Sequence, residues 1–408
     1  MSKTFEQARA IILERVEPLE IERVVLAAAI GRILAAEIKA PWGMPLWDNS
    51  AMDGFAVGSE ACEQEGEVRL VISAYIPAGQ SAEGIELAPG CAVKVMTGAP
   101  VPVGSAAVVP VEHTEEVGDV VVIKDRIKTG NHIRYRQEDI AEGEIVLRPG
   151  TLLRPPESSL LASFGLLSVP VYRRPAVAIL STGDELVAPG EPPGPGQIVD
   201  SNSHSLAAAV IEMGAEPVML GIARDDRDDL REKLTRGLQA DVLVSSAGIS
   251  VGDRDFVQEI LLELGVETIF TKVRVKPGRP TTFGVCNGKP VFALPGNPVS
   301  GLLTFEQFVR PALLRMMGHR EVIKPLVKAQ LTHTIRKKSG SVQLYRVRLY
   351  RQGDGWMAAS AGDQNTGILK TLVNANGIAI LPSDKEIFTA GEEIEVHLLP
   401  GSFQQGPG

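Results

Sequence analysis

The sequence predicts a multidomain protein of the α/β plus β class, and three observations carry this prediction. The chain has 408 residues, which exceeds a single domain and fits two to four of them. From Ala176 onward, apolar β runs alternate with amphipathic helical stretches, which is typical of a central domain with a parallel α/β sheet. Before and after this region, short alternating runs predict a small β module and a C-terminal β barrel or sandwich.

The composition excludes several classes of function. Hydrophobic residues make up 44% and charged residues 22%, as in an ordinary globular protein rather than a disordered one. With 41 basic and 50 acidic residues the net charge is −9, which argues against bulk electrostatic binding to nucleic acid or to an anionic membrane. Aromatic residues are only 5%, too few for a platform that stacks single-stranded bases. Any bound anion must therefore be held by a local basic site.

The cysteines and the N-terminal residues indicate the cellular compartment in which the protein is expected. Cys62, Cys91 and Cys286 are far apart and form no CxxC pair, which favours a reducing environment. The first residues lack the uninterrupted apolar core of a signal peptide, and no stretch reaches about 18 uncharged apolar residues. We therefore expect a cytoplasmic protein with neither a membrane nor a nucleic acid as partner.

The N-terminal segment is predicted to be helical up to about residue 39. Thr4 and Gln7 have the spacing of a capping box. The apolar face of the helix that follows consists of Phe5, Ala8 and Ile12. A second apolar run of helical spacing consists of Val24, Leu26, Ile30 and Leu34.

The region that follows, up to about residue 153, has a different pattern of residues. Residues 45–56, PLWDNSAMDGFA, have a polar centre flanked by aromatics, which predicts an ordered loop rather than a strand, and such loops often carry function. From Val68 to about Leu153, alternating runs separated by glycine and acidic turns predict a small antiparallel β module. A short helix is expected from Glu157 to Leu166.

The loops that follow the strands of the central domain are the first candidate for a ligand site. These loops are residues 181–185, 224–226, 247–255 and 295–298. Ligands of open parallel sheets bind outside the carboxyl ends of the strands, where glycines let the backbone approach a phosphate. Taken singly, Asp225, Asp226 and Asn297 could simply cap their helices, with Pro298 in the first turn. Four polar loops on one edge favour a ligand site.

A row of cations is predicted on one strand of this acidic protein. The alternation of a strand puts Lys272, Arg274 and Lys276 on one face, with Arg279 just beyond a Pro-Gly turn. Such a row suggests binding of a phosphate or an oxoanion. The alternative is a solvated edge strand whose charges prevent aggregation.

Carboxylates on the same edge could hold a hard cation. They are Asp184, Glu185, Asp225, Asp226, Asp253 and Asp255. Mg²⁺ needs only one or two carboxylates, together with water and substrate phosphates. Zinc spacing, a Walker A loop and a GxGxxG motif after a strand are all absent from the sequence, which argues against zinc, generic ATPase and dinucleotide sites.

A serine-hydrolase interpretation also needs weighing. Residues 248–252, GISVG, follow a strand and match GxSxG. A nucleophile elbow runs from its serine directly into a helix, whereas Gly252, Asp253 and Arg254 intervene here. The acidic residues of the loop would also oppose a developing oxyanion. The motif alone is therefore weak support for a hydrolase.

Eight motifs occur together and in order along essentially the whole chain. They are DNSAMDGFA, MTGAPVP, GNHIRYRQED, AILSTGDEL, GQIVDSNS, SSAGISVGDRD, VRVKPGRP and LPGNPVSG. In this combination the sequence resembles the molybdopterin molybdenumtransferase family, MoeA, which is related to the C-terminal half of gephyrin. The resemblance implies Mg²⁺-dependent cleavage of adenylylated molybdopterin with insertion of molybdate into the dithiolene, giving molybdenum cofactor and AMP.

The resemblance also implies the assembly and the domains. It implies an elongated homodimer whose active site combines the α/β domain of one subunit with the DNSAMDG module of the other. The expected domains are a discontinuous linking domain (1–43 and 145–172), an inserted β module (44–144), a molybdopterin-binding α/β domain (173–322) and a C-terminal β barrel (323–408). The pterin-adenylylating enzyme and apo-molybdoenzymes are further candidate partners.

The functional residues of the family carry over to eight positions of this sequence. They are Asp53, Thr97, Glu185, Asp225, Asp255, Lys272, Lys276 and Thr366. We expect catalytic roles for Asp53, Thr97 and Glu185, and metal binding by Asp225 and Asp255. The residues expected to bind the substrate or its anionic groups are Lys272, Lys276, Arg274, Ser250, Gly248, Gly252, Asn297 and Thr366. The chain departs from the family pattern at Ala247, Arg279 and Thr366, where glycine, lysine and serine are usual.

Two other functions remain open from the sequence. Relatives of the gephyrin type also act as scaffolds, although a scaffold does not require the edge of carboxylates and cations. A pterin-adenylylating relative is the other alternative, since the α/β domain alone resembles that enzyme. The additional N-terminal and C-terminal modules argue against the latter.

Overall fold

The computed structural model describes residues 2–246 and 256–399. The chain forms two compact units, of which the first comprises Met1–Ala35, Gly150–Ser158 and Ser168–Gly408 and the second Ala36–Pro149 and Ser159–Leu167. Among the described residues, no helix is long and apolar enough to cross a membrane.

The first unit contains the predicted α/β sheet, with six strands. In sheet order they are β17 (Glu216–Ala223), β14 (Ala176–Thr182), β18 (Val242–Ser246), β23 (Lys289–Leu294), β22 (Thr282–Cys286) and β19 (Glu267–Phe270). The first four strands are parallel, as expected, whereas β22 runs antiparallel to both of its neighbours. The cause is a tight hairpin at Asn287-Gly288, where both φ angles are positive (50° and 80°) and the Asn-Gly sequence suits the turn.

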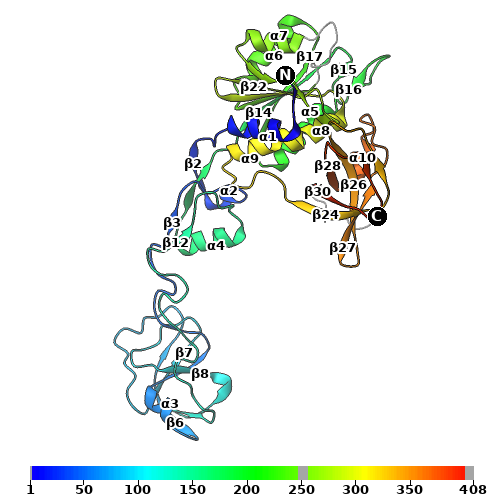
Figure 1. Cartoon of the computed structure of the whole chain (residues 1–408). Helices are drawn as coiled ribbons and strands as arrows, with labels where there is room; N and C mark the ends of the chain where they lie inside the picture. Colours follow the sequence, from blue (N-terminus) through cyan, green and yellow to red (C-terminus); the bar gives the residue numbers. More distant parts are fainter. Residues whose placement is uncertain (1, 247–255, 400–408) are drawn as a thin grey trace. The chain divides into compact units, whose positions relative to one another are not determined.

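Helices cover both faces of this sheet (Figure 1). On one face lie α6 (Arg227–Gly237) and α7 (Phe256–Glu263), packed on a core that includes Leu180 and Ile260. The opposite face is covered by α1 (Phe5–Glu14), α5 (Asn202–Glu212), α8 (Pro298–Thr304), the π-helical turn η2 (Phe305–Val309) and α9 (Arg310–Met316). Thr4 and Gln7 form the expected capping box of α1, and Phe5, Ala8 and Ile12 are buried as predicted.

The prediction of continuous helix to residue 39 is wrong beyond α1. Residues Ile21–Val25 form strand β2, which pairs antiparallel with β13 (Ser168–Tyr172), and only the short helix α2 (Leu26–Ala29) follows. The run contains the β-branched residues Ile21, Val24 and Val25, and pairing with a strand distant in sequence overrides the helical spacing. The short helix expected near residue 160 is present as α4 (Pro155–Ser163).

The second unit contains a six-stranded sheet. Its order is β8 (Ala107–Pro110), β5 (Gly54–Val57), β7 (Cys91–Val95), β6 (Val68–Ile76), β10 (Val120–Ile123) and β9 (Thr114–Val117). The module is antiparallel as expected except for β6 and β7, which pair in parallel. The predicted loop over residues 45–56 also holds two strands, β5 and the short β4 (Asn49–Ser50), which pairs with β11 (Ile133–Arg134).

Smaller elements complete the two units. They are β1 (Ser2–Lys3), β3 (Ile38–Lys39), β12 (Ile145–Leu147), β15 (Leu186–Val187), β16 (Ile198–Val199), α3 (Ser59–Glu63) and the turn η1 (Val111–His113).

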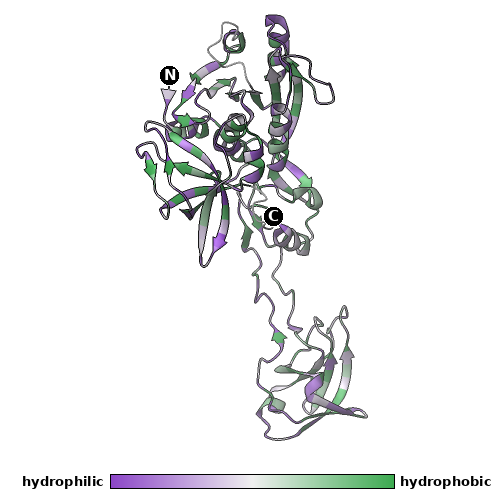
Figure 2. Cartoon of the chain, turned by 90° about the vertical axis from the view of Figure 1, so that its right-hand side faces the viewer, coloured by the Kyte–Doolittle hydropathy of each residue, from purple (hydrophilic) through white to green (hydrophobic). Residues whose placement is uncertain are grey.

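The C-terminal region is a closed five-stranded barrel, which resolves the alternatives of barrel and sandwich. Around the barrel lie β26 (Val342–Gln352), β27 (Gly355–Ser360), β24 (Leu326–Leu331), β30 (Glu393–Leu398) and β28 (Gly377–Leu381), and β28 pairs back onto β26. The short elements β25 (Ile335–Arg336), β29 (Ile387–Phe388) and α10 (Lys370–Asn374) lie between these strands in sequence. Hydrophobic and hydrophilic residues alternate along the barrel strands (Figure 2). Alternate side chains therefore fill the barrel interior.

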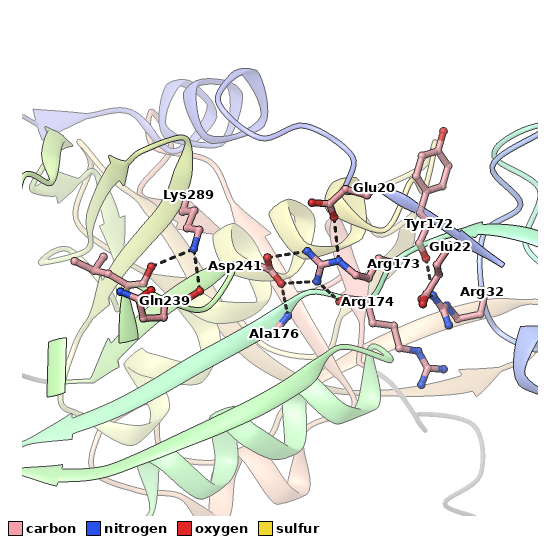
Figure 3. A network of polar contacts seen from close by, with 11 residues as sticks. Glu20, Glu22, Arg32, Tyr172, Arg173, Arg174, Ala176, Gln239, Asp241 and Lys289 are labelled. Carbon is pink, nitrogen blue, oxygen red and sulfur yellow. Dashed lines mark hydrogen bonds and ion pairs between the residues drawn. The ribbon is translucent and has the colours of Figure 1, made fainter. Parts of the chain in front are cut away.

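A network of ion pairs anchors the start of the α/β sheet (Figure 3). Arg173 donates to both carboxylate oxygens of Asp241 at 2.7 and 2.9 Å and to Glu20 at 2.9 Å, and Asp241 also accepts the Ala176 N–H at 2.8 Å. Burial by itself raises the pKa of Asp241, but the hydrogen bonds from Arg173 and Ala176 outweigh it and hold this pKa below its usual range. The network joins the chain before the sheet to the first residue of β14.

Candidate active site

A cleft of about 400 Å³ lies at the carboxyl ends of β14, β18 and β23. This is the sheet edge at which the sequence predicts a ligand. The lining consists of Thr182, Glu185, Leu186, Ile198, Val199, Asp200, Ser201, Asn202, Ser246, Pro280, Pro295, Gly296, Asn297 and Pro298. Both Glu185 and Asn297, two of the predicted site residues, are therefore in the wall of one cleft.

Asp200 organises the wall at the start of α5. The carboxylate is buried and accepts hydrogen bonds from the Ser181 hydroxyl (3.0 Å), the Ser203 hydroxyl (2.6 Å) and the backbone N–H groups of Asn202 and Ser203. The Asn202 side chain continues this network, because its Nδ2 donates to Ser246 Oγ and to the Gly296 carbonyl, both at 2.7 Å. The ends of three neighbouring strands are thus held together by two side chains.

Glu185 depends on the glycine two residues before it. Gly183 has φ of +143°, and a Cβ at this position would lie 2.4 Å from Glu185 Oε2. Glycine suits this position mainly because residues with a side chain rarely adopt such a φ angle, and its missing Cβ also leaves room for the Glu185 carboxylate. Glu185 itself is exposed, which leaves its charge available to a ligand in the cleft.

The end of β23 leads into α8 through the last of the four predicted loops, residues 295–298. Asn297 occupies the N-cap position of α8, and Pro298 is in the first turn, as the capping alternative predicts. The Asn297 side chain makes no capping hydrogen bond to the described helix. Its amide is therefore free of the structural role that would compete with ligand binding.

The loop after β17 contains Asp225 and Asp226, for which the sequence allowed either helix capping or ligand binding. Asp226 is the N-cap of α6, and its side chain accepts the N–H groups of Asp228 and Asp229, both at 3.0 Å. Asp225 does not take the cap position, and its backbone N–H instead donates to Asp184 Oδ1 at 3.1 Å. The capping explanation thus applies to Asp226, while Asp225 lies beside Asp184.

The donor chemistry of this edge fits a magnesium ion. Asp184 and Asp225 come from adjacent loops and are in contact, and their carboxylates are the hard oxygen donors that Mg²⁺ prefers. Within residues 2–246 and 256–399, no three His, Cys, Asp or Glu side chains form a complete metal site by themselves. The predicted ligand Asp255 lies outside the described residues, as do Ala247, Gly248, Ser250 and Gly252.

The cation row has the predicted alternation. Lys272, Arg274 and Lys276 are exposed, while Val273 and Val275 between them are buried. The row is split into β20 (Lys272–Val273), which pairs with β1, and β21 (Val275–Lys276), which joins barrel strand β26. None of the three cations belongs to the described lining of the cleft, so the geometry leaves both the anion-binding and the solvated-strand interpretations open.

Asp53 and Thr97 are brought together in the second unit. Asp53 Oδ1 accepts both the backbone N–H and the hydroxyl of Thr97, each at 2.7 Å. The backbone hydrogen bond and then the hydroxyl hydrogen bond lower the pKa of Asp53, so the carboxylate is held in its charged form. Asp53 in the polar loop and Thr97 in a Thr-Gly turn are 44 residues apart in the sequence, and the fold brings them together as an exposed, hydrogen-bonded pair.

Thr366 lies in the loop between β27 and α10 of the barrel. The adjoining backbone is held by Arg346, which is fully buried and donates from Nη2 to the carbonyls of Asp363 (2.9 Å) and Asn365 (3.2 Å). Thr366 itself is half-buried.

Sequence reasoning missed the residues that shape the cleft. Asp200 and Asn202 belong to the motif GQIVDSNS, which marked the family resemblance without a chemical role. The available signal was an aspartate three residues before a serine at a helix start, the spacing of a capping residue. Thr182 belongs to the loop 181–185 that the sequence predicted at the ligand site, but the sequence assigned it no role of its own, and the structure places it in the lining.

Comparisons with known proteins bear on the whole chain. Three family domains match it: the MoeA N-terminal region (domain I and II) over residues 3–165, the probable molybdopterin binding domain over 178–315 and the MoeA C-terminal region (domain IV) over 328–399. The molybdopterin molybdenumtransferase 2 of Mycobacterium tuberculosis is 37% identical over 405 residues, which covers 97% of this chain and 99% of that protein. The molybdopterin molybdenumtransferase of Bacillus subtilis is 35% identical over 390 residues, covering 93% and 90%.

The fold agrees with a solved structure of the same kind. The crystal structure of the molybdopterin biosynthesis MoeA protein from Pyrococcus horikoshii superposes with a TM-score of 0.84 at 31% identity, covering 98% of this chain and 100% of that one. With matched domains in the same order and relatives above 30% identity over nearly its full length, the chain belongs to the MoeA family of molybdopterin molybdenumtransferases.

Proposed function

We propose that this protein is the transferase that completes the molybdenum cofactor. It takes adenylylated molybdopterin, breaks the phosphoanhydride bond to AMP and places the metal of molybdate on the dithiolene sulfurs. The observation that carries this proposal is the cleft at the carboxyl ends of β14, β18 and β23. It lies within the domain that matches a probable molybdopterin binding domain, and Glu185 and Asn297 line it.

Different groups of residues have different roles in the proposed reaction. In the cleft, Asn297 offers an uncommitted amide to the substrate, and Glu185 orients a polar group of the pterin or a water. Lys272, Arg274 and Lys276 supply the positive charge that an oxoanion and a phosphate require in a protein of net charge −9. Asp53, kept ionised by Thr97, has the catalytic role that the family resemblance implies.

Magnesium is the metal that we propose for the reaction. Asp225 and Asp255 would hold it, with Asp184 beside Asp225. When bound, Mg²⁺ supplies a Lewis acid that stabilises the charge on the leaving AMP. Carboxylates gathered at one edge repel one another, and a bound cation would offset that repulsion.

The proposal also covers the oligomeric state, the compartment and the partner proteins. The protein acts as a homodimer in the cytoplasm, where its sparse cysteines stay reduced. Molybdate is the oxoanion, the pterin-adenylylating enzyme delivers the substrate and apo-molybdoenzymes receive the product.

AMP release tests the proposal. The protein is incubated with adenylylated molybdopterin, Mg²⁺ and molybdate, and AMP is quantified together with activation of an apo-molybdoenzyme. We expect AMP release that depends on molybdate and stops when a chelator removes the metal. Binding of partner proteins without AMP release would instead favour the scaffold function, and formation of adenylylated pterin from ATP would favour the adenylylating relative.

A further inference from the structure

Two oxygens of cleft residues lack hydrogen-bond donors. Thr182 Oγ1 and Asn202 Oδ1 are buried and have no hydrogen-bond partner in the part of the chain that the structure describes. The Thr182 residue is only 2% exposed. Polar atoms that are buried in this way are unfavourable in the free protein, so their presence in the lining of a cleft calls for an explanation.

The orientation of the Asn202 amide is determined by its neighbours. Its Nδ2 donates to the Gly296 carbonyl, which can only accept, and to Ser246 Oγ. Turning the amide over would place Oδ1 against the Gly296 carbonyl, with two acceptors facing each other. Oδ1 is therefore kept as an acceptor that awaits a donor from elsewhere.

The Thr182 hydroxyl can donate as well as accept, whereas Asn202 Oδ1 can only accept and needs a ligand group with an N–H or O–H donor. Phosphate oxygens and molybdate carry no such donor at neutral pH, so the anionic parts of the substrate do not suit Asn202 Oδ1. Adenine offers a single amino group flanked by ring acceptors. The pyrimidine edge of a pterin presents an exocyclic amino group directly beside a ring N–H, so it can donate to Asn202 Oδ1 and has a second donor for the Thr182 hydroxyl.

We propose that Asn202 and Thr182 recognise the amino-pyrimidinone edge of the pterin ring and so determine which heterocycle the cleft accepts. This inference rests on the proposed function and assigns a part of the substrate to a part of the site. Both oxygens are shielded from water in the free chain, so the pterin edge displaces neighbouring side chains slightly as it enters. The anionic end of the substrate then faces away from these two residues.

A pair of ring analogues tests the assignment. Binding of 6-hydroxymethylpterin and of 6-hydroxymethyllumazine, in which an oxygen replaces the exocyclic amino group, is measured by ligand-observed NMR titration of the full chain. We expect the pterin to bind about tenfold more tightly, because a site with unpaired acceptors rejects a ligand that brings another acceptor. Equal affinities of the two rings for the wild-type protein would overturn the proposal.

Variants identify the residues responsible. Thr182→Val removes the hydroxyl at nearly constant volume, and Asn202→Ala removes the amide. Each should weaken pterin binding about tenfold and reduce the preference over lumazine. Because the Thr182 hydroxyl has no hydrogen-bond partner among residues 2–246 and 256–399, Thr182→Val should also leave the melting temperature unchanged or higher.

Thr282→Val is the matched control. Thr282 is 5% exposed and its hydroxyl is equally unpartnered among the described residues, but it does not line the cleft. Its substitution should leave the affinity for pterin as in the wild type, and an equal loss in both threonine variants would contradict the assignment. Molybdate-dependent AMP release is measured on the same wild-type sample to separate the transferase function from the recognition of the pterin edge. If AMP is released but the protein binds pterin and lumazine equally, only the recognition by Thr182 and Asn202 is refuted.

Discussion

At the residue scale, the charge of Asp53 depends on Thr97. Two hydrogen bonds from this threonine lower the pKa of the carboxyl group, the backbone bond first. In Thr97→Val the hydroxyl bond is lost, so the pKa of Asp53 should rise toward its usual value in an NMR titration. Thr97→Ser keeps both donors and should leave the pKa as it is.

The sign of this shift determines its pH dependence. The folded-state pKa of Asp53 lies below the unfolded value. The stabilisation is therefore present above the unfolded pKa and is lost as the pH falls through the folded pKa. A valine variant whose Asp53 titrates like the wild type would show that the hydroxyl contributes nothing to this charge.

Asp225 and Asp226 are adjacent but should respond differently to substitution. Asp226 caps α6, so Asp226→Ala should lower the free energy of unfolding by about 1 kcal/mol in urea titrations. Asp225 is not the cap, so Asp225→Asn should unfold like the wild type while magnesium-dependent AMP release falls at least about tenfold. Full AMP release with an unchanged magnesium requirement in Asp225→Asn would remove it from the metal site.

Individual site residues could be predicted from the sequence only where a polar side chain directly follows a predicted strand of the α/β sheet. Glu185 and Asn297 follow predicted strands and do line the cleft. The contact between Asp53 and Thr97 could not be derived from spacing, since 44 residues separate them and only the family resemblance connected them. Asp225 was assigned by resemblance together with its loop position, whereas the capping role of Asp226 follows from local chemistry.

At the scale of elements, strand β30 carries a histidine that should limit stability in acid. His397 is 4% exposed, and burial, followed by the charges of Arg9, Lys324 and Arg310, lowers its pKa to about 4. Since an unfolded histidine titrates near pH 6.5, the unfolded chain binds the proton first as the pH falls. Stability should therefore decrease between about pH 6.5 and pH 4.

The uncharged variant His397→Gln isolates this effect. Between pH 7 and pH 5, the unfolding free energy of the wild type should fall by about 2 kcal/mol more than that of the variant. Urea titrations at the two pH values measure both quantities. Parallel pH profiles would mean that His397 titrates normally in the folded barrel.

The elements that the sequence predicted well are those decided by local patterns. The capping box and apolar face of α1 and the strand–helix alternation after Ala176 need no distant partner. The helix expected through Val24 was wrong because β2 (Ile21–Val25) gains its stability from pairing with β13, some 145 residues away along the chain, and helix resumes only in the short α2 from Leu26. The parallel pairing of β6 with β7 is likewise a property of the fold and not of either run.

At the scale of the whole molecule, the proposed homodimer predicts complementation between inactive subunits. Asp53→Ala and Glu185→Ala damage different parts of the proposed site, and each variant alone should be inactive. If each site draws on both subunits, an equal mixture after subunit exchange should regain about a quarter of wild-type AMP release. Subunit exchange without any recovery of activity would contradict the shared site.

The whole-chain prediction depended on resemblance more than on physics. Charge and composition argued against bulk electrostatic binding to nucleic acid or to an anionic membrane, but they did not identify a substrate. The barrel could not be distinguished from a sandwich by alternation alone, because closure is the pairing of β28 with β26 over about 35 intervening residues. Eight ordered motifs supplied the family, which the matched domains and relatives confirm.

The central claim is that the cleft at the end of the α/β sheet receives the pterin substrate. A crystal structure of the protein with adenylylated molybdopterin and Mg²⁺ tests it most directly. We predict density for the ligand in the cleft, with its pterin ring at Thr182 and Asn202 and with Glu185 and Asn297 in contact with it. A ligand bound elsewhere, for example in the 620 Å³ hollow beside Trp47 in the second unit, with this cleft empty, would contradict the account.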